Sequence, residues 1–533
     1  MGLWKVSPIR ISTIHSYVGT IGVDHMENTK AKSQKWAITL FTIGVFMAGL
    51  DNGIISTALT TINDSFGVSP AWGAWSITLY TLGIAISVPI IGKLSDRFGR
   101  RRLFIIEIAI FGVGSLLVAL SPNFIFLLAA RFIQSIGGGG IFIIGSSHIL
   151  ATLPKDKQGK ALGLLGGMHG ISAVIGPNLG AVILSLTGSW HWMFLINIPI
   201  AIFLVVFGYL KIEETKPGTA KPLDFLGTVL LTFGILALMY GITNLNSQAL
   251  LQSITDLTVA PFLVIGLLLF VLFVLHERRV EERDGDPIIK FSLLKNRLFQ
   301  VTLILGLLSG GFLAGIIFIP SFVQQVLQVP AEKAGYWLTP MALASGIGAG
   351  LGGYLTDKQG AVKTVIYAGV IGVIGFFFFP VWVDGLGTFI VASVLAGIGL
   401  GILLGAPLNV LVGESAASNE EGSALGTLSL IRQMGLSLFP TLYAGYIAGA
   451  FTNIAPVMKD KYGDLGLENV NGEENYGAVI EQVLRISDPG TRANALQTVS
   501  DVLKAGFNQM YITAGVLAFL VMGIGFYLLI RKK

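Results

Sequence analysis

The chain has 533 residues, of which 53% are hydrophobic and only 12% are charged, and its mean hydropathy is +0.75. Because a soluble domain carries about 25% charged residues, this composition excludes a soluble globular protein and predicts an all-α protein that crosses a membrane many times. The net charge of +5 is small and spread over loops, which argues against a nucleic-acid partner, and the absence of cysteine excludes disulfide and thiol chemistry.

The N-terminal segment, residues 1–35, is polar and mixed, and it lacks the apolar core and small-residue cleavage site of a signal peptide. We therefore predict that this segment stays in the cytoplasm. Met26 opens a short basic stretch, MENTKAKSQKW, which is typical of the lead into a first membrane helix. Translation is accordingly expected to start at Met26 and not at Met1.

Windows of about 20 apolar residues, the length needed to cross roughly 30 Å of hydrocarbon, define the membrane spans. Fourteen such windows follow one another along the chain. The predicted spans are 37–62, 72–92, 103–121, 124–150, 161–186, 192–212, 223–245, 258–277, 298–320, 333–355, 364–384, 387–413, 423–450 and 506–530.

Lysine and arginine orient these spans, because basic loops stay in the cytoplasm. The basic residues gather in alternate loops, such as residues 93–102 and 278–297, whereas the short loops between them, such as 63–71 and 187–191, have none. Both termini are therefore predicted to be cytoplasmic, in a multi-pass protein of the plasma membrane. Residues 451–505 are predicted to form a long polar external loop, in which VIEQVLRI and ALQTVSDVLKAGF have the spacing of amphipathic helices.

Two cytoplasmic loops repeat one motif. GKLSDRFGRRR (Gly92–Arg102) and GYLTDKQGAVK (Gly353–Lys363) both read G-x-L-x-D-x-x-G and end in a base. The loops lie eight spans apart, which predicts two six-helix halves with an extra pair of helices between them, as in transporters that alternate access to a site at mid-membrane. The predicted regions are an N-terminal bundle at 36–212, inserted helices seven and eight with their linkers at 213–290, and a C-terminal bundle at 291–533.

Further motifs carry a resemblance to a known family. RFIQSIGGGG (131–140) and GKLSDRFGRRR resemble the helix-4 and loop signatures of the major facilitator superfamily, and GISAVIGPNLGAVI (170–183) resembles the helix-5 signature of its antiporters. LDNGIISTALTTI (50–62) is similar to the helix-1 signature of the fourteen-helix drug:proton antiporter branch. The residues that depart from that signature are Gly53, Ser56 and Thr60, where the branch usually has Thr, Asn and Pro. The resemblance implies the major facilitator fold and proton-driven export without a cofactor, by a protein that we expect to be monomeric.

Asp51 is a carboxylate inside the first span, where a charged Asp costs on the order of 3 kcal/mol. One interpretation is a protonated Asp that only hydrogen-bonds to a neighbouring helix; the other is a proton carrier whose proton affinity changes with burial and partner. At about 1.5 Å per residue, Arg131 of the fourth span lies at a similar depth, and Gln134 lies one turn further along. We predict that these three residues couple transport to protons, as the resembled family ties its matching arginine to proton coupling; the alternative is a structural ion pair.

The repeated loops are predicted to latch the two halves together on the cytoplasmic side. Asp96 can accept backbone N–H groups at a helix start, and Arg100 can pair with it. A purely topological role would explain the bases Arg101 and Arg102, but not the acid and the glycines. The predicted latch residues are Gly92, Asp96, Gly99 and Arg100 in the first loop, and Gly353, Asp357 and Gly360 in the second.

GISAVIGPNLGAVI combines small residues with a proline in the middle of the fifth span. Small residues let helices approach closely, and a proline removes one backbone donor and kinks the helix. The combination favours a bent hinge over ordinary glycine packing. The predicted hinge residues are Gly170, Gly176, Pro177 and Gly180.

Polar residues inside other spans point to a substrate cavity, although Arg432 and Gln433 could equally bind facing carbonyl groups. The predicted cavity residues are Asn52, Ile55, His169, Arg432 and Gln433. Glu107, near the cytoplasmic end of the third span, is expected to reach the arginines of the loop before it. We predict no cofactor and no metal, because GAGLGG (Gly348–Gly353) lies inside a span and neither a P-loop nor an H-E-x-x-H motif occurs.

Together these patterns predict a secondary exporter of the multidrug-efflux type, which exchanges protons for amphipathic or hydrophobic small molecules by alternating access. No second carboxylate lies deep in the later spans, which favours a neutral, anionic or monocationic substrate over a dication. Export of a native metabolite or lipid is an open alternative. The alternative of another class is a membrane receptor that binds without transport, although a receptor has no need for two matching loops. A membrane enzyme would need a polar catalytic cluster, which the sequence lacks.

Overall fold

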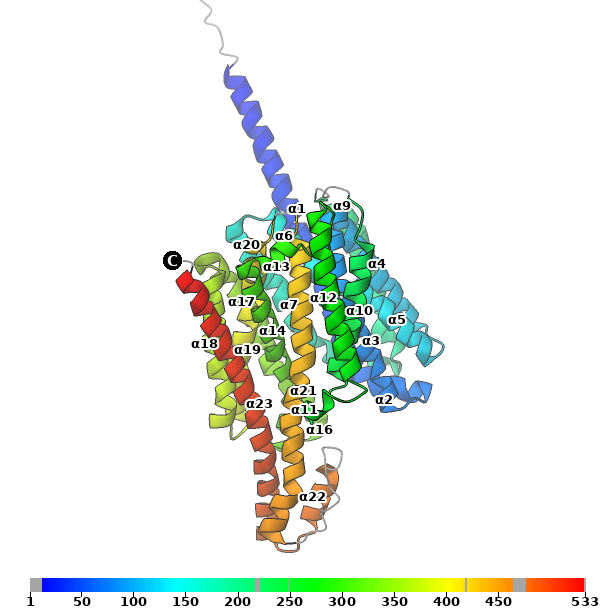
Figure 1. The fold of residues 1–533 in the computed structure, drawn as a ribbon, viewed down its shortest axis with the longest axis vertical. Coiled ribbons are helices and arrows are strands. Elements are labelled where there is room, and N and C mark those ends of the chain that lie inside the picture. The colour runs from blue at the N-terminus through cyan, green and yellow to red at the C-terminus, as the bar shows by residue number, and fades with distance from the viewer. Residues whose placement is uncertain (1–11, 216–220, 248, 418, 464–475, 532–533) are drawn as a thin grey trace, which may run out of the picture.

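Every regular element in the part of the chain that the computed structural model describes is a helix (Figure 1). The predicted all-α fold is therefore confirmed. The N-terminal residues 1–11, with Met1, and residues 464–475 of the predicted external loop lie outside the described residues. The described ranges are 12–215, 221–247, 249–417, 419–463 and 476–531.

The first helices of the chain pack mainly on one another, and we call them the N-terminal group. This group consists of α1 (Ser12–Phe66), α2 (Pro70–Gly73), α3 (Trp75–Phe98), α4 (Arg100–Ala119), α5 (Phe124–Gly139), α6 (Ile141–Thr152), α7 (Lys155–Thr187), α8 (His191–Leu195) and α9 (Asn197–Lys211).

The last helices form a corresponding C-terminal group. It consists of α14 (Arg297–Ile317), α15 (Ile319–Gln325), α16 (Ala331–Ala334), the 3₁₀ helix η1 (Gly335–Leu338), α17 (Thr339–Gln359), α18 (Ala361–Trp382), α19 (Leu386–Gly405), α20 (Pro407–Ser415), α21 (Glu421–Tyr462), α22 (Tyr476–Leu484) and α23 (Pro489–Arg531). The two groups touch where α7 packs on α17 and where α3 packs on α21.

An inserted pair of long helices lies between the groups in the sequence. α10 packs on α12, and α10 also contacts α3 of the first group and α21 of the second. The helices of this region are α10 (Phe225–Thr243), α11 (Leu250–Ser253), α12 (Ala260–Glu282) and α13 (Phe291–Lys295).

Twelve helical segments among the described residues are long and apolar enough to cross a membrane, and α7 makes a thirteenth when its two arms count as one span. The glycine-rich helix α17, TPMALASGIGAGLGGYLTDKQ, is not among them, because glycine contributes little hydropathy. The predicted count of fourteen, and the predicted region boundaries after residues 35, 212 and 290, stay predictions.

Local sequence sets several helix starts and ends. Asn123 and Asn296 accept hydrogen bonds from backbone N–H groups of the first turns of α5 and α14, which caps those helices. Gly99 and Gly360 turn the chain between α3 and α4 and between α17 and α18, with φ of +96° and +88°. Side chains are strained at such angles, so both positions favour glycine.

Helix α7 bends by 41° between an arm ending at Ser172 and an arm starting at Ile175. Pro177 lies four residues after Ala173, and its ring removes the hydrogen bond to that carbonyl group. The kink predicted from the proline is therefore present in the structure.

Two helices extend far beyond their predicted spans, 423–450 and 506–530. α21 continues to Tyr462 and α23 begins at Pro489, and with α22 they form a hairpin that projects from the bundle (Figure 1). Their apolar side chains continue to pack together beyond the spans, which explains the extra turns. VIEQVL and ALQTVSDVLKAGF are helical, as predicted.

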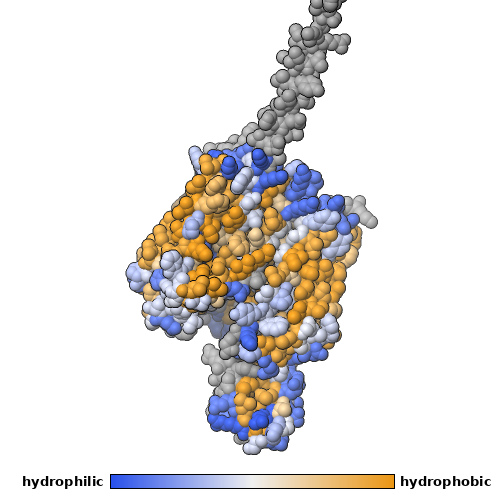
Figure 2. Space-filling view, turned by 180° about the vertical axis from the view of Figure 1, so that it is seen from behind, coloured by the Kyte–Doolittle hydropathy of each residue, from blue (hydrophilic) through white to orange (hydrophobic). Residues whose placement is uncertain are grey.

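The bundle has an apolar side and two distinct ends. Hydrophobic residues cover most of its side, while hydrophilic residues gather at the ends and on the hairpin (Figure 2). We call the end that carries Gly99 and Gly360 the basic face, and the opposite end the hairpin face. α1 projects beyond the basic face, and the described chain also ends there at Arg531 (Figure 1).

Candidate functional site

Asp51, Arg131 and Gln134 meet inside the N-terminal group. The Arg131 guanidinium donates from Nη1 to Asp51 Oδ2 at 2.6 Å and to Gln134 Oε1 at 2.7 Å. Gln134 Nε2 donates to Asp51 Oδ1 at 2.8 Å, because residues three apart on α5 share one face of the helix. The structure thus brings the three predicted coupling residues of α1 and α5 into mutual contact.

Sequence reasoning missed further members of this cluster. Asn197, the first residue of α9, donates from Nδ2 to Asp51 Oδ1 at 3.2 Å and to Ser115 Oγ at 3.0 Å. The sequence contains a signal for Asn197, because this residue is the one amide side chain within the apolar run MFLINIPIAIF. The ring centre of Tyr80 on α3 lies 4.0 Å from Arg131 Cζ, where its π face stabilises the cation.

The geometry of the cluster fits an ionised Asp51. Its carboxylate receives N–H groups from Arg131, Gln134 and Asn197. Such donors stabilise a carboxylate, whereas a protonated carboxyl group needs an acceptor for its own proton. Protonation of Asp51 therefore breaks the ion pair and leaves a buried cation, at a cost of several kcal/mol. The hydrogen bonds of Asp51 thereby tie α1 to α5 and α9.

The cluster is sealed from solvent in this conformation. Asp51, Arg131 and Gln134 have no exposed surface. Two nitrogens of the guanidinium group, Nε and Nη2, have no hydrogen-bond partner among the described residues. Buried donors without partners are unfavourable, so the cation gains stability from any rearrangement that offers it another acceptor.

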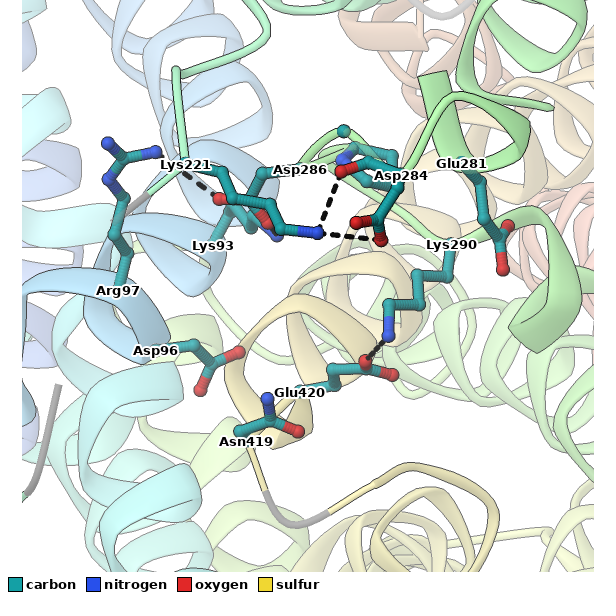
Figure 3. Close-up of a pocket in the computed structure, with 12 residues that line it drawn as sticks. Lys93, Asp96, Arg97, Lys221, Glu281, Asp284, Asp286, Lys290, Asn419 and Glu420 are labelled. Carbon is teal, nitrogen blue, oxygen red and sulfur yellow. Dashed lines mark hydrogen bonds and ion pairs between the residues drawn. The ribbon is translucent and has the colours of Figure 1, made fainter. Parts of the chain in front are cut away.

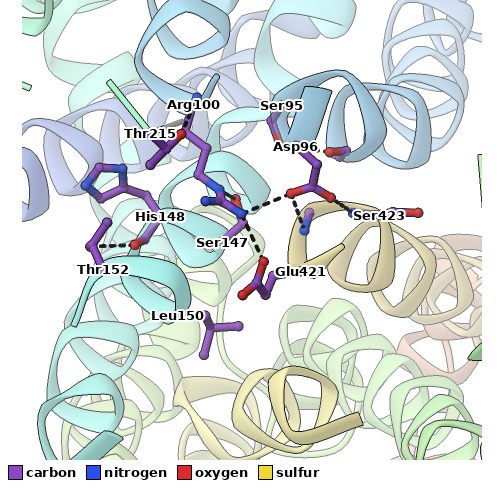
Figure 4. Close-up of polar contacts among 12 residues, drawn as sticks. Ser95, Asp96, Arg100, Ser147, His148, Leu150, Thr152, Thr215, Glu421 and Ser423 are labelled. Carbon is purple, nitrogen blue, oxygen red and sulfur yellow. Dashed lines mark hydrogen bonds and ion pairs between the residues drawn. The ribbon is translucent and has the colours of Figure 1, made fainter. Parts of the chain in front are cut away.

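On the basic face, Asp96 joins α3 to the start of α21. Its carboxylate accepts hydrogen bonds from the backbone N–H groups of Gly422 and Ser423 at 3.0 and 2.9 Å (Figure 4). These N–H groups have no partner within α21 and carry the positive end of its dipole. Arg100 Nη2 donates to Asp96 Oδ1 at 3.0 Å and to Glu421 Oε2 at 3.1 Å. We call this contact the first latch.

A second latch repeats the first with the two groups exchanged. Asp357 of α17 accepts hydrogen bonds from the backbone N–H groups of Gly159 and Lys160 in α7, at 2.6 and 2.9 Å. The glycines one turn before each latch aspartate lie against backbone: a Cβ on Gly92 would lie 2.3 Å from the Gly422 oxygen, and one on Gly353 would lie 2.3 Å from the Gly159 oxygen. The predicted latch residues therefore lie at the contacts between the groups or in the turns beside them.

The glycines of α7 face two different helices. A Cβ on Gly176 would lie 2.8 Å from Gly53 Cα, and a Cβ on Gly180 would lie 2.4 Å from Thr57 Oγ1, both on α1. Gly170 instead faces α17, where an added Cβ would meet no atom nearer than 3.6 Å. α7 thus contacts the other group before its bend and packs tightly on α1 after it.

We expect Gly176→Ala to lower thermal stability and transport, and Gly170→Ala to be tolerated. The methyl group at position 176 has no room against the backbone of α1, and overpacking costs about 1–3 kcal/mol. Gly170→Ala is the matched control, because it makes the same change on the same helix where contacts are ordinary. The melting temperature of the purified variants is the measurement; equal values for both would contradict this packing account.

The predicted cavity residues differ in their accessibility. Asn52 and His169 are exposed, and Arg432 and Gln433 are half-buried. Arg432 Nε donates to Ser309 Oγ at 3.2 Å, and its Nη2 has no partner among the described residues.

Ile55 requires a correction to the predicted cavity. Only 1% of this residue is exposed, because it packs in an apolar cluster with residues of α4, α5 and α8. It therefore lies on the inner side of α1 and not on an accessible surface.

The expectation for Glu107 was wrong. Its Oε2 accepts a hydrogen bond from the Gly140 N–H at 3.1 Å, and its Oε1 has no partner among the described residues. The predicted fourth span is interrupted at Gly140, between α5 and α6, and the carboxyl group is drawn to that break instead of to the loop arginines.

Comparison with known proteins agrees with this architecture. The chain matches the family model of the Major Facilitator Superfamily over residues 41–440. It is 58% identical over 501 residues to the uncharacterised MFS-type transporter YfiU of Bacillus subtilis (strain 168), covering 92% of this chain and 96% of that protein. It is 30% identical over 510 residues to Multidrug resistance protein 3 of the same organism, with 92% and 94% covered. The crystal structure of the human organic anion transporter MFSD10 (TETRAN) shares the fold, with a TM-score of 0.56 and 15% identity over 91% of this chain and 99% of that one.

The polytopic helical bundle and the family match together identify a membrane transporter. The chain belongs to the Major Facilitator Superfamily, because the family model covers most of its length. It is accordingly a multi-pass membrane transporter of small molecules and not an enzyme.

Proposed function

We propose that this protein is a proton-coupled exporter of amphipathic or hydrophobic small molecules, a member of the fourteen-helix drug:proton antiporter branch. It works as a monomer in the plasma membrane and needs no cofactor beyond the proton gradient. The observation that carries the proposal is the buried ion pair of Asp51 and Arg131, whose atoms lie 2.6 Å apart. Neither residue has any solvent-exposed surface in this conformation.

The basic face is assigned to the cytoplasm, because lysine and arginine gather in its loops. Both termini then lie in the cytoplasm. The two latches hold α3 against α21 and α17 against α7 at that face. The conformation described here is therefore closed toward the cytoplasm.

The transport cycle follows from the chemistry of the cluster. A proton from outside neutralises Asp51, which frees Arg131 and moves α1 against α5 and α9. This movement favours release of the latches, so that substrate enters from the cytoplasm while Asp51 loses its proton there. Formation of the ion pair then restores the closed latches. Each positive charge that enters the cell down the membrane potential supplies about 2.3 kcal/mol for each 100 mV, and this energy drives export.

The C-terminal group favours particular substrates. In its described helices the acidic residues lie only toward the ends of the spans, so a dication would find no second carboxylate at mid-membrane. The half-buried side chains of Arg432 and Gln433 suit a neutral, anionic or monocationic molecule with apolar surface. The similarity to Multidrug resistance protein 3 supports an efflux role.

The test uses everted vesicles energised by respiration and a panel of fluorescent dyes, lipids and native metabolites. A transported compound is expected to accumulate in the vesicles and to dissipate part of the pH gradient, and a protonophore should abolish both signals. Accumulation that persists with the protonophore would contradict proton coupling. A response to metabolites or lipids alone would identify a metabolite or lipid exporter, and binding without accumulation would identify a receptor.

A further inference from the structure

Two buried carboxyl groups meet at the basic-face end of the inserted pair. Asp224 caps α10: its Oδ1 accepts a hydrogen bond from the Gly227 N–H at 2.8 Å and lies 2.8 Å from His276 Nε2. Glu277 of α12 has no exposed surface, and its Oε2 accepts a hydrogen bond from the Ile289 N–H at 2.9 Å. The remaining oxygens, Asp224 Oδ2 and Glu277 Oε1, are buried and accept no hydrogen bond from any described residue.

These two unpartnered oxygens converge on one point. A Cβ built on Gly227 would lie 2.2 Å from Asp224 Oδ2 and 2.4 Å from Glu277 Oε1. The two carboxyl groups are near enough to hydrogen-bond to each other. Two carboxylates cannot do so, because both are acceptors only. One proton between the two oxygens turns a repulsive contact into a hydrogen bond.

Few charges face this pair of acids. His276 lies beside Asp224 on α12, with its side chain about one-quarter exposed. The charge of Lys93 on α3 also acts on Glu277, but its Nζ is already bound to Asp286 Oδ1 at 2.5 Å. Among the described residues in contact with the pair, His276 is the one base that could offset a second negative charge, and it is a cation only when protonated.

Glu277 also holds a segment that we call the strap, residues 284–290, which follows α12. At its first end the strap is tied to the N-terminal group: Asp286 pairs with Lys93 at 2.5 Å and with Arg97 at 3.2 Å (Figure 3). Lys221 of the linker before α10 binds the exposed Asp284 at 2.7 Å, and this bond lowers the pKa of Asp284. These residues line a polar cavity of about 320 Å³ on the basic face.

At its other end the strap is tied to the C-terminal group. The Ile288 carbonyl group accepts a hydrogen bond from Ser423 Oγ, next to the first latch. Lys290 pairs with Glu420 (Figure 3), and this hydrogen bond raises the pKa of Lys290. Ile289, whose N–H is held by Glu277, lies between these attachments. The strap is therefore a third tie across the basic face.

We propose that Asp224 and Glu277 form a second proton-binding site, which shares one proton and controls the strap in response to cytoplasmic pH. With the proton in place, Glu277 is bonded to Asp224 and to the Ile289 N–H, and the strap stays closed. Loss of the proton at alkaline cytoplasmic pH sets two negative charges against each other, displaces Glu277 and releases Ile289. The cytoplasmic face then opens more readily. The site lies outside the Asp51 cluster and binds its proton whether or not Asp51 couples transport.

The first test detects this proton directly, by infrared difference spectroscopy of the purified full-length protein in H₂O and D₂O. The spectrum of Glu277→Gln is subtracted from the spectrum of the natural protein. The difference is expected to show a protonated-carboxyl band at neutral pH that disappears at alkaline pH. Asp224→Asn, which keeps an oxygen to cap α10, should remove the same band. Glu282→Gln is the matched control, because it removes an exposed acid from the same helix. No band in either difference spectrum would overturn the proposal.

The second test measures the cytoplasmic face. The chain has no cysteine, so spin labels at Lys157→Cys and Lys358→Cys, both exposed, report the distance between the two groups. The measurement is made with and without Asp51→Asn, and a shift present in both backgrounds does not depend on the proposed coupling site. The distance is expected to shift toward the open state as pH rises, and Glu277→Gln should lose this shift. A shift that persists in Glu277→Gln would assign the pH response to the latch acids Asp96 and Glu421 and overturn control by the pair.

Discussion

Asp51→Asn is expected to abolish proton-linked transport while the helical fold remains. The amide has the size of the carboxylate and can still accept a hydrogen bond, but it binds no proton and leaves the Arg131 cation without a counter-charge. Breaking a buried ion pair by neutralising one partner costs about 3–5 kcal/mol, so the melting temperature should fall while the circular dichroism of the helices is kept. In energised everted vesicles, the substrate-driven loss of the pH gradient should drop to the level of vesicles without the protein.

Asp64→Asn is the matched control for this variant. Asp64 is an exposed acid on the same helix, and its replacement should leave proton exchange unchanged. Arg131→Ala should also lose coupling, because Asp51 then has no cation to bind and release. If Asp51→Asn exchanges protons at the rate of the natural protein, the ion pair is only a structural contact.

Asp96→Asn is expected to shift the protein toward a conformation open at the cytoplasmic face. Asp96 accepts hydrogen bonds from two backbone N–H groups of α21 and from Arg100. An amide offers one acceptor oxygen and places its NH₂ group against a backbone N–H. Losing one charge-assisted hydrogen bond is worth about 2 kcal/mol, which corresponds to roughly a 30-fold change in the ratio of open to closed molecules.

Spin labels at Lys157→Cys and Lys358→Cys measure this shift as a new, longer distance population. Asp357→Asn should open the face through the second latch, and the double variant should open it further. Asp156→Asn, which removes an exposed acid beside the labelled position, is the control. Distance distributions that match the natural protein in both latch variants would contradict the role of the latches.

The ion pair, the latches and the bend of α7 could be predicted from the sequence, because each depends on a residue type at a position that the sequence defines. Asp51 and Arg131 are charged residues in apolar spans, and counting residues from the span ends placed them at one depth. Asp96 and Asp357 were found because the loop motif repeats, and a repeated motif in a two-fold arrangement has equivalent partners. Pro177 predicted the bend of α7, because the missing N–H acts locally.

Other features depend on how each helix is rotated and on where the groups touch, which the sequence does not determine. Ile55 is one turn from Asp51, and the rotation of α1 buries both residues, with Ile55 in the apolar cluster. Asn197 donates to Asp51 only because α9 starts beside α4. Glu107 binds at a helix break beside the four glycines 137–140, and although glycines weaken a helix, they do not indicate which side chain binds at the break.

The acids of the inserted pair illustrate the same limit. Asp224 and Glu277 belong to different helices, and only the packing of α10 on α12 brings their oxygens together. The extensions of α21 and α23 follow from apolar contacts between them beyond the predicted spans.

The most direct measurement of the Asp51–Arg131 site is the number of protons that the purified protein releases when substrate binds in weakly buffered detergent solution. The natural protein is expected to release protons into the medium as the ion pair forms, whereas Asp51→Asn binds the same substrate and releases none. Equal proton release by the two proteins would contradict the assignment of Asp51 as the coupling site.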